Sequence, residues 1–224
     1  MKVTWLGQAG LLIETEGKKI ILDPYLSNSV EAIEPQNKRR VPVEERFLRI
    51  QPDILILTHD HLDHTDPETL VHYLKKDSKV LVLASGNAYI HARKQFGGEN
   101  NYVLFNRLTR WTEGNIRFLA VRAEHSDDHA IGVILESEGK TLYITGDTLY
   151  NDGIFADLPE KIDYVFLPVN GRGNNMNMED GARFCEKIGA KAVPLHWGLF
   201  DSLDGKDFPY DNKSVPQFYE EIML

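Results

Sequence analysis

The densest group of side chains suited to metal chemistry lies in residues 58–64, which read THDHLDH and directly follow the apolar run ILIL. Side chains alternate along an extended chain, so His59 and His61 can point to the same side. A turn after them would bring Asp63 and His64 to face the same pocket. Imidazoles and carboxylates are the ligands that borderline divalent metals take. The segment therefore predicts a metal site, with two ions favoured over one; the alternative, a solvated acidic loop, would not need three histidines.

Three further candidate ligands occur at the ends of other apolar segments. His125 follows a predicted strand at 116–123, Asp147 follows one at 141–145, and His196 follows one at 192–195. Each alone could be a turn residue or a packed residue. Ligand-binding residues collect at the carboxyl ends of strands in α/β sheets, so the four strand ends together predict one site.

The remaining pattern predicts short strands alternating with helices. A meander of strands is expected at 2–5, 10–14 and 19–22, and further strands at 80–84, 131–136 and 164–169. Helices are expected from the Asp66 cap to about residue 76, and at 87–96, 178–188 and 215–223. Residues 27–49 form a long polar connection that is either a flap over the site or a surface loop; its basic run at 38–40 is expected to be solvated.

Length and composition narrow the class of protein. The 224 residues, 42% hydrophobic and 26% charged, fit one globular domain over 1–224. A net charge of -9 argues against a nucleic-acid partner, and no apolar run approaches a membrane span. No signal peptide is recognisable, and Cys185 is the only cysteine, so a cytoplasmic protein is expected. Cys185 is expected to be a buried small residue of the 178–188 helix.

With these motifs in place, the chain resembles the metallo-β-lactamase superfamily. The resemblance rests on the 58–64 segment, His125, the TGDT sequence around Asp147, and His196, in that family's order. Within the superfamily the chain looks most like the ascorbate-6-phosphate lactonase group, through WLGQAG at 5–10, DPY at 23–25, DDHAIG at 127–132 and PLHW at 194–197. The resemblance implies an α/β metallo-β-lactamase fold, a four-layer αβ/βα sandwich of two mixed sheets flanked by helices, with the site at one edge.

The same resemblance implies a division of the ligands between two divalent ions, Zn²⁺ or Mn²⁺. His59, His61 and His125 would hold the first ion; Asp63, His64 and His196 would hold the second, and Asp147 would bridge both. Asp63 and Asp147 would thus belong to the catalytic centre. Two such ions can share a water and lower its pKa to about 7, which gives a hydroxide that attacks a carbonyl carbon or a phosphorus.

Several other residues are candidates for roles around the metals. His129 could transfer protons or contact substrate, or simply begin a strand; Asp60 could orient an imidazole. Arg172, with Asn170 of the same NGRG loop, is the candidate for gripping a phosphate or carboxylate. Trp197 and Phe200 follow a ligand and could wall the pocket. His72 and His91 are expected to be surface or packing residues.

The leading functional hypothesis is hydrolysis of a small anionic ester or lactone, for example a sugar-phosphate lactone. The alternatives are a phosphodiesterase, a di-iron redox protein of the same fold, and a metal-binding scaffold without turnover. Redox relatives usually carry an electron-transfer domain, for which 224 residues leave no room. The expected partner is a small molecule, without nucleic acid or membrane, and association into a homo-oligomer stays open.

Overall fold

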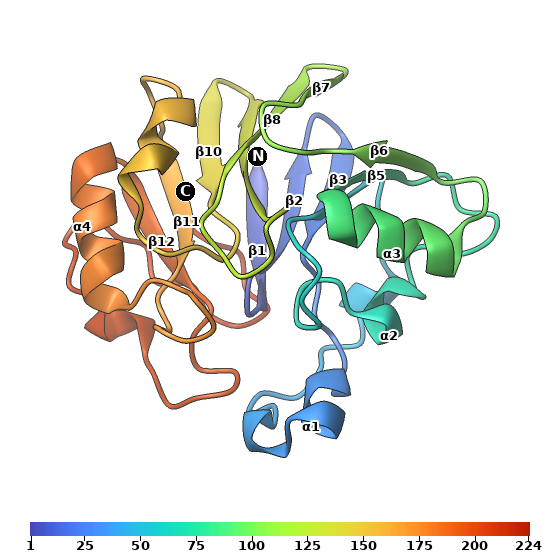
Figure 1. Cartoon of the computed structure of the whole chain (residues 1–224), viewed down its shortest axis with the longest axis horizontal. Coiled ribbons are helices and arrows are strands. Elements are labelled where there is room, and N and C mark those ends of the chain that lie inside the picture. Colours follow the sequence, from blue (N-terminus) through green and yellow to red (C-terminus); the bar gives the residue numbers. More distant parts are fainter.

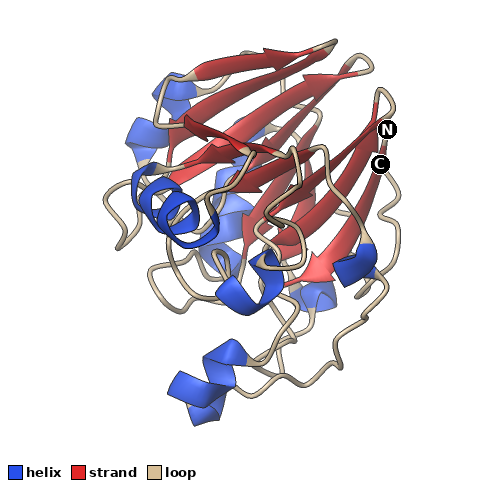
Figure 2. Ribbon diagram, turned by 90° about the vertical axis from the view of Figure 1, so that its right-hand side faces the viewer, coloured by secondary structure: helices blue, strands red, loops and turns tan.

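Two six-stranded mixed sheets stack face to face in the computed structural model, which describes residues 1–224 (Figures 1 and 2). The first sheet contains, in spatial order, β1 (Lys2–Gly7), β2 (Gly10–Thr15), β3 (Lys18–Leu22), β4 (Ile54–Leu57), β5 (Leu81–Ala84) and β6 (Asn101–Leu104). The second contains, in spatial order, β12 (Lys191–Leu195), β11 (Tyr164–Pro168), β10 (Lys140–Ile144), β9 (Ile131–Ser137), β8 (Ile116–Arg122) and β7 (Arg110–Glu113).

The strand directions bring the predicted ligands to a common edge. In the first sheet β1, β2 and β3 are antiparallel, and β3 to β6 run parallel. In the second sheet β9 is antiparallel to both β8 and β10, while β10, β11 and β12 are parallel. Strands β8, β10 and β12 therefore point the same way, and their carboxyl ends lie at one edge of the sheet.

The apolar run of β4 is explained by burial on both faces, which is typical of a parallel strand covered by layers on either side. Ile54 and Ile56 belong to a core cluster of 38 buried residues that fills the space between the sheets. Leu55 and Leu57 belong to a second cluster of 15 buried residues on the outer face of the first sheet. The four leucines and isoleucines fix this strand firmly just before the ligand segment begins.

Few helices cover the sheets. They are α1 (Ser29–Ile33), α2 (Pro67–Leu70), α3 (Gly86–Phe96) and α4 (Met178–Ile188), with 3₁₀ turns at Pro35–Asn37, Phe47–Arg49, Asp152–Asp157 and Gly205–Asp207. Figure 1 shows α2 and α3 beside the first sheet, α4 beside β11 and β12, and α1 projecting from the body. None of the helices combines the length and the apolar composition needed to cross a membrane. The predicted sandwich of two mixed sheets with helices on both outer sides is confirmed.

The helix predicted to begin at the Asp66 cap does so, but it is shorter than expected. The Asp66 carboxylate accepts hydrogen bonds from the Glu68 and Thr69 amides. The α-helix then ends at Leu70 instead of near residue 76. Tighter bonds, from the amides of His72 and Tyr73 to carbonyls three residues earlier, continue the chain as turns. Tyr73 is thereby kept buried, with its hydroxyl donating to the Phe47 carbonyl at 3.0 Å.

The predicted helix at 215–223 is wrong. The segment runs along the open edge of β1 instead: the Tyr219 amide donates to the Trp5 carbonyl at 2.8 Å and the Ile222 amide to the Val3 carbonyl at 2.7 Å. The helical pattern of this segment does not decide its structure, because the uncovered edge of β1 offers unpaired backbone groups with which the segment forms hydrogen bonds. A few residues earlier, the Ser214 amide donates to the Ala192 carbonyl of β12. Strands β6 and β7 were not predicted; both are partly exposed edge strands without a buried residue.

We expect the aromatic contact that holds this last segment to be a measurable part of the stability. Phe218 stacks on Trp5 with ring centroids 4.2 Å apart and also packs beside Gly7 and Gly198. Phe218→Ala should lower the free energy of unfolding by about 2–3 kcal/mol in urea titrations, since a half-buried ring is lost. Met223→Ala, at a 79% exposed position, is the control and should change it by less than about 0.5 kcal/mol. Equal effects of the two substitutions would contradict the packing role of Phe218.

Candidate metal centre

A tight turn after β4 assembles the ligand segment. The His64 and Thr65 amides both donate to the His61 carbonyl, at 3.0 and 2.8 Å, and the Thr65 hydroxyl donates to the His59 carbonyl at 2.7 Å. The chain therefore doubles back within seven residues. His59 and His64 end fully buried, whereas His61 and Asp63 stay partly exposed. The turn that the sequence suggested is confirmed.

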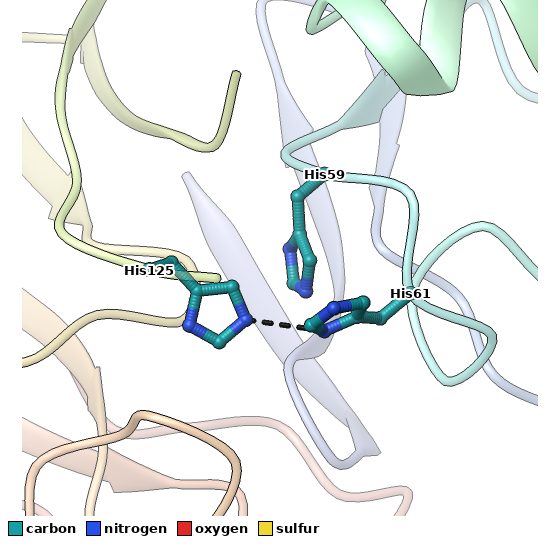
Figure 3. Close-up of side chains that lie close together, drawn as sticks. All are labelled: His59, His61 and His125. Carbon is teal, nitrogen blue, oxygen red and sulfur yellow. Dashed lines mark hydrogen bonds between the residues drawn. The ribbon is translucent and has the colours of Figure 1, made fainter. Parts of the chain in front are cut away.

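Three histidines from the two sheets form the first ligand group, shown in Figure 3. The ring nitrogens of His59, His61 and His125 lie within 4.8 Å of one another. His125 Nε2 and His61 Nδ1 face each other at 3.1 Å. The Nδ1 of His125 donates to the Asn174 carbonyl at 3.1 Å, so its Nε2 is the nitrogen available to a metal.

The second ligand group consists of Asp63, His64 and His196, again with ligand atoms within 4.8 Å of one another. Asp147 lies beside this group: its Oδ1 is 3.4 Å from His64 Nε2, and its Oδ2 is 3.3 Å from His196 Nε2. The two groups adjoin, since the ring centroids of His59 and His64 are 4.0 Å apart. All seven residues predicted as ligands are thus brought to one place, although Asp147 as the bridge between two ions stays a prediction.

The chemistry of this cluster fits divalent metal. His59 Nε2 is buried and has no hydrogen-bond partner, an arrangement that is costly unless another group satisfies the nitrogen. Burial, reinforced by the neighbouring His64, holds the pKa of His59 well below its usual value, so the ring is neutral. A neutral imidazole with a free nitrogen is the form that binds a metal.

Charge in the second group is balanced by protons on histidine. Burial by itself would lower the pKa values of His64 and His196, but the surrounding carboxylates, Asp147 first, raise that of His64 well above its ordinary value and that of His196 to about 10. Burial likewise opposes ionisation of Asp63 and Asp147, yet the two histidines hold both carboxyl pKa values below their usual range. Without metal, protonated imidazoles therefore carry the positive charge that bound cations would supply.

Asp23 is the most important site residue that the sequence reasoning missed. Its carboxylate accepts from His64 Nδ1 at 2.9 Å and from the Thr58 amide at 2.8 Å, and it is fully buried. Such a carboxylate fixes the ring and leaves Nε2 facing the metal position. The DPY segment contributed only to the resemblance, yet Asp23 directly follows an apolar strand, the same signal that identified the other candidate ligands.

Side-chain amides hold several other residues of the cluster, and no sequence pattern predicted that role for them. Gln8 Nε2 donates to Asp63 Oδ2 at 3.0 Å, and Asn175 Nδ2 donates to Asp147 Oδ2 at 2.8 Å. The Asn170 amide lies 3.0 Å from His196 Nδ1. An amide has both a donor and an acceptor, so Asn170 can hold this ring in either protonation state. Asn170, predicted as a substrate contact, therefore has a positioning contact with a ligand.

Left-handed backbone is concentrated at the site. Gln8, Asp23 and His196 have φ angles of 47°, 42° and 62°, which lie in the left-handed region that residues other than glycine rarely adopt. Gly146 has φ 60°, and a Cβ atom there would lie 2.7 Å from the Ile131 carbonyl oxygen. Glycine is therefore required immediately before Asp147. Strain of this kind persists where the surrounding structure enforces it, as at functional sites.

Three predicted site residues lie elsewhere. Asp60 points away from the ligands and pairs with His91 Nδ1 at 2.9 Å, so it orients an imidazole of α3 instead of a ligand. His129 is exposed, with its ring against Gly86, and is not brought into the cluster. Trp197 is buried against Trp5, with ring centroids 5.0 Å apart, because the left-handed turn at His196 directs it into the core.

Asp127 is a second residue that sequence reasoning did not assign. Its carboxylate accepts from the Asp60 amide at 3.0 Å, from Asn87 Nδ2 at 2.8 Å and from the His129 amide at 2.9 Å. These bonds join the loop that carries His125 to the ligand turn and to α3. The hydrogen bonds of Asp127 therefore help to place His125, from the second sheet, relative to His59 and His61, from the first.

A cavity of about 400 Å³ opens over the ligands. His61, Asp63, Asp147 and His196 line its floor. Phe200 lines the cavity, as expected, and Trp197 does not; Arg172 also lines it, while its role in binding an anion stays a prediction. The long connection contributes as well, through Val30 and Ile33 of α1 and through Glu34 and Asn37.

Comparison with known proteins gives a consistent result. Residues 2–196 match a family model described as "Beta-lactamase superfamily domain". The chain is 31% identical over 234 residues to a UPF0173 metal-dependent hydrolase from Ligilactobacillus salivarius, covering 99% of this chain and 97% of the relative. The superfamily prediction is confirmed, and the ascorbate-6-phosphate lactonase-like subgroup stays a prediction.

Solved structures agree on the fold. One described as a possible metal-dependent hydrolase from Veillonella parvula has a TM-score of 0.81 at 17% identity, covering 100% of this chain and 99% of that one. The diiron β-hydroxylase CmlA from Streptomyces venezuelae has a TM-score of 0.73 at 17% identity, and its match covers 100% of this chain but 54% of CmlA. At these identities the likeness concerns the fold alone.

We expect metal binding to release protons and to strengthen as pH rises. The raised pKa values of His64 and His196 mean that both rings are protonated at neutral pH, and a metal takes the neutral form. Calorimetric titration of the metal-free protein, in buffers of different ionisation enthalpy, should show about two protons released on filling the second group at pH 7. A pH-independent affinity without proton release would contradict this charge balance.

We expect Asp23→Ala to weaken metal binding without removing a ligand. Loss of the carboxylate that orients His64 should lower affinity about 10- to 100-fold, measured by competition with a chromophoric chelator. Asp77→Ala, at an exposed position, is the matched control and should leave affinity unchanged. Unaltered affinity in the Asp23 variant would show that the ring is positioned by other contacts.

Proposed function

The chain belongs to the metallo-β-lactamase superfamily and is a metal-dependent hydrolase, and from this premise we propose that it uses two divalent ions, Zn²⁺ or Mn²⁺, to hydrolyse a small anionic ester or lactone. The observation that carries the proposal is the pair of adjoining three-residue ligand groups with Asp147 beside them. One ion would be held by His59, His61 and His125, and the other by the second group. The buried, unpartnered nitrogen of His59 supports the first position.

The bound ions would supply Lewis acidity, which lowers the pKa of water toward neutrality and polarises a carbonyl or phosphoryl oxygen. The chain's own groups prepare the site for that chemistry. In the metal-free protein Asp63 and Asp147 are ionised, because the protonated neighbouring histidines depress their pKa values, and bound cations would keep them in the same form. An ionised carboxylate can orient a water by accepting its hydrogens. Gln8 and Asn175 each hold one oxygen of these carboxylates and restrict their rotation.

The size and lining of the cavity support a small substrate. About 400 Å³ accommodates a metabolite-sized molecule, in line with ordinary ligand pockets. Arg172 is exposed on the wall above the ligands, and its guanidinium fork matches a carboxylate or a phosphate. The same wall would also serve a phosphodiester, so a phosphodiesterase is the second candidate.

A redox role is the less supported reading. CmlA shares only the fold with this chain at 17% identity, whereas the relative from Ligilactobacillus salivarius, matched over 97% of its length, is described as a metal-dependent hydrolase. Elemental analysis separates the classes: about two zinc or manganese ions per chain favour hydrolysis. Iron with visible absorbance would contradict the proposal.

We propose that the enzyme works in a reducing cytoplasm. We also propose that its partner is a small-molecule substrate. Cys185, the lone cysteine, is buried in α4 as predicted, and burial raises the pKa of its thiol. An unreactive thiol of this kind supports a packing role.

Turnover tests the proposal directly. The metal-loaded protein is assayed on a sugar-phosphate lactone, on other anionic esters and on bis(p-nitrophenyl) phosphate. Arg172→Ala should raise KM for the anionic substrate by about 10- to 100-fold with metal content unchanged, since a charge-assisted hydrogen bond is lost. Arg110→Ala, on the exposed β7 strand, is the control.

A second variant tests the centre itself. Asp147→Ala should lose both turnover and part of the metal, because the carboxylate contacts both histidines of the second group. An active, metal-free Asp147→Ala protein would overturn the mechanism. An unchanged KM in Arg172→Ala would remove that residue from substrate binding.

A further inference from the structure

One wall of the cavity is apolar. Val30 and Ile33 of α1 lie on it with Leu62 of the ligand turn and Phe200. Ile33 is 73% exposed, although it lies on a helix that lines the cavity. Figures 1 and 2 show α1 projecting from the two sheets, so this wall is an addition to the sandwich.

The other surfaces of the cavity are polar. Asn170, Arg172 and Asn175 come from the loop between β11 and α4, and the ligands form the floor. At the rim, Glu34 and Asn37 hydrogen-bond to each other. The cavity is therefore lined by four apolar side chains, by Arg172 as its only arginine or lysine, and by residues of the metal cluster, with the acidic Glu34 and Asp201 also on its lining.

The apolar wall is held in a fixed position. The buried Arg39 donates to the Tyr25 carbonyl at 3.0 Å and to the Tyr219 hydroxyl at 2.7 Å, which closes the base of the projecting segment. The Val30 amide donates to the Tyr25 hydroxyl at 3.1 Å, and the Tyr25 ring meets Phe200 edge-on at 5.6 Å. A preformed wall costs a ligand little ordering entropy.

We propose that the substrate is amphipathic: an ester or lactone whose apolar acyl or alkyl substituent packs against α1 while its anionic group faces Arg172. This inference rests on the proposed function and narrows its substrate class. An exposed isoleucine beside Val30, Leu62 and Phe200 gains from contact with hydrocarbon, since apolar surface is removed from water. A sugar phosphate would instead place its hydroxyl groups against these apolar side chains, where the hydroxyl groups find no hydrogen-bond partner on the protein.

The reaction consumes one water. The oxygen of the water forms the new bond to the acyl carbon, and the bond from that carbon to the ester oxygen breaks. One proton of the water goes to the leaving oxygen, and the other is released to solvent. The products are a carboxylate with the apolar chain and an alcohol, which remain one molecule when the substrate is a lactone. Straight-chain carboxylates therefore serve as product-like probes of the apolar wall.

The test measures chain-length dependence in two ways. Acetate, butyrate and hexanoate are titrated calorimetrically into the metal-loaded protein, and the corresponding p-nitrophenyl esters are assayed for turnover. Affinity should rise about two- to threefold per methylene, because the open cavity buries part of each group. The test variant is Ile33→Ser, and the matched control is Ile90→Ser, a 62% exposed isoleucine of α3 outside the cavity.

Each outcome decides a separate point. A steep dependence in the wild-type and Ile90→Ser proteins that flattens in Ile33→Ser supports the proposal. Absence of binding, a flat wild-type series, or equal slopes in both variants overturns it. Chain-length-dependent binding without turnover of any ester or lactone would instead contradict the proposed hydrolytic function and leave the apolar subsite established.

Discussion

Buried negative charge is the constraint on which the rest of this structure depends. Asp23, Asp63 and Asp147 carry carboxylates in or near the interior, where an unpaired charge is very costly. His64 and His196 neutralise them through direct contacts. The surrounding residues meet the same requirement: the amides of Gln8, Asn170 and Asn175 contact the charged groups, and left-handed backbone at Gln8, Asp23 and His196 positions three of the side chains involved.

The sandwich accommodates these charged side chains because it places them at the edge of the sheets instead of between them. The space between the sheets is filled mainly by the cluster of 38 buried apolar residues, and His59, His125, Asp147 and His196 lie one to three residues after their strands have ended. Strand direction does the sorting: one intervening antiparallel strand, β9, lets β8 and β10 point the same way. His125 and Asp147 consequently reach the same edge, although a hairpin separates them in the chain.

The sequence was most informative where chemistry coincided with a strand end. His59, His125, Asp147 and His196 each follow an apolar run, and that rule, with the resemblance, identified all seven side chains that the structure gathers in one cluster. The same rule would have found Asp23, which also follows an apolar strand. Gln8, Asn170 and Asn175 act through amides, which are common in loops, so no local pattern distinguishes them. The predictions for Trp197 and for residues 215–223 were wrong for another reason. The left-handed turn at His196 and the open edge of β1 arise from the tertiary structure, and local sequence pattern does not report them.

The segment that closes both sheets has a consequence for the order of assembly. Residues 212–214 pair with β12 and residues 219–222 pair with β1. Phe218 packs beside Gly7 and Gly198, which lie close in sequence to Gln8 and His196. A chain that stopped before residue 212 would contain every residue of the metal cluster but would leave the edges of β1 and β12 open to pairing with neighbouring chains. The residues of the metal cluster are therefore synthesised before the segment that protects the two sheets from aggregation.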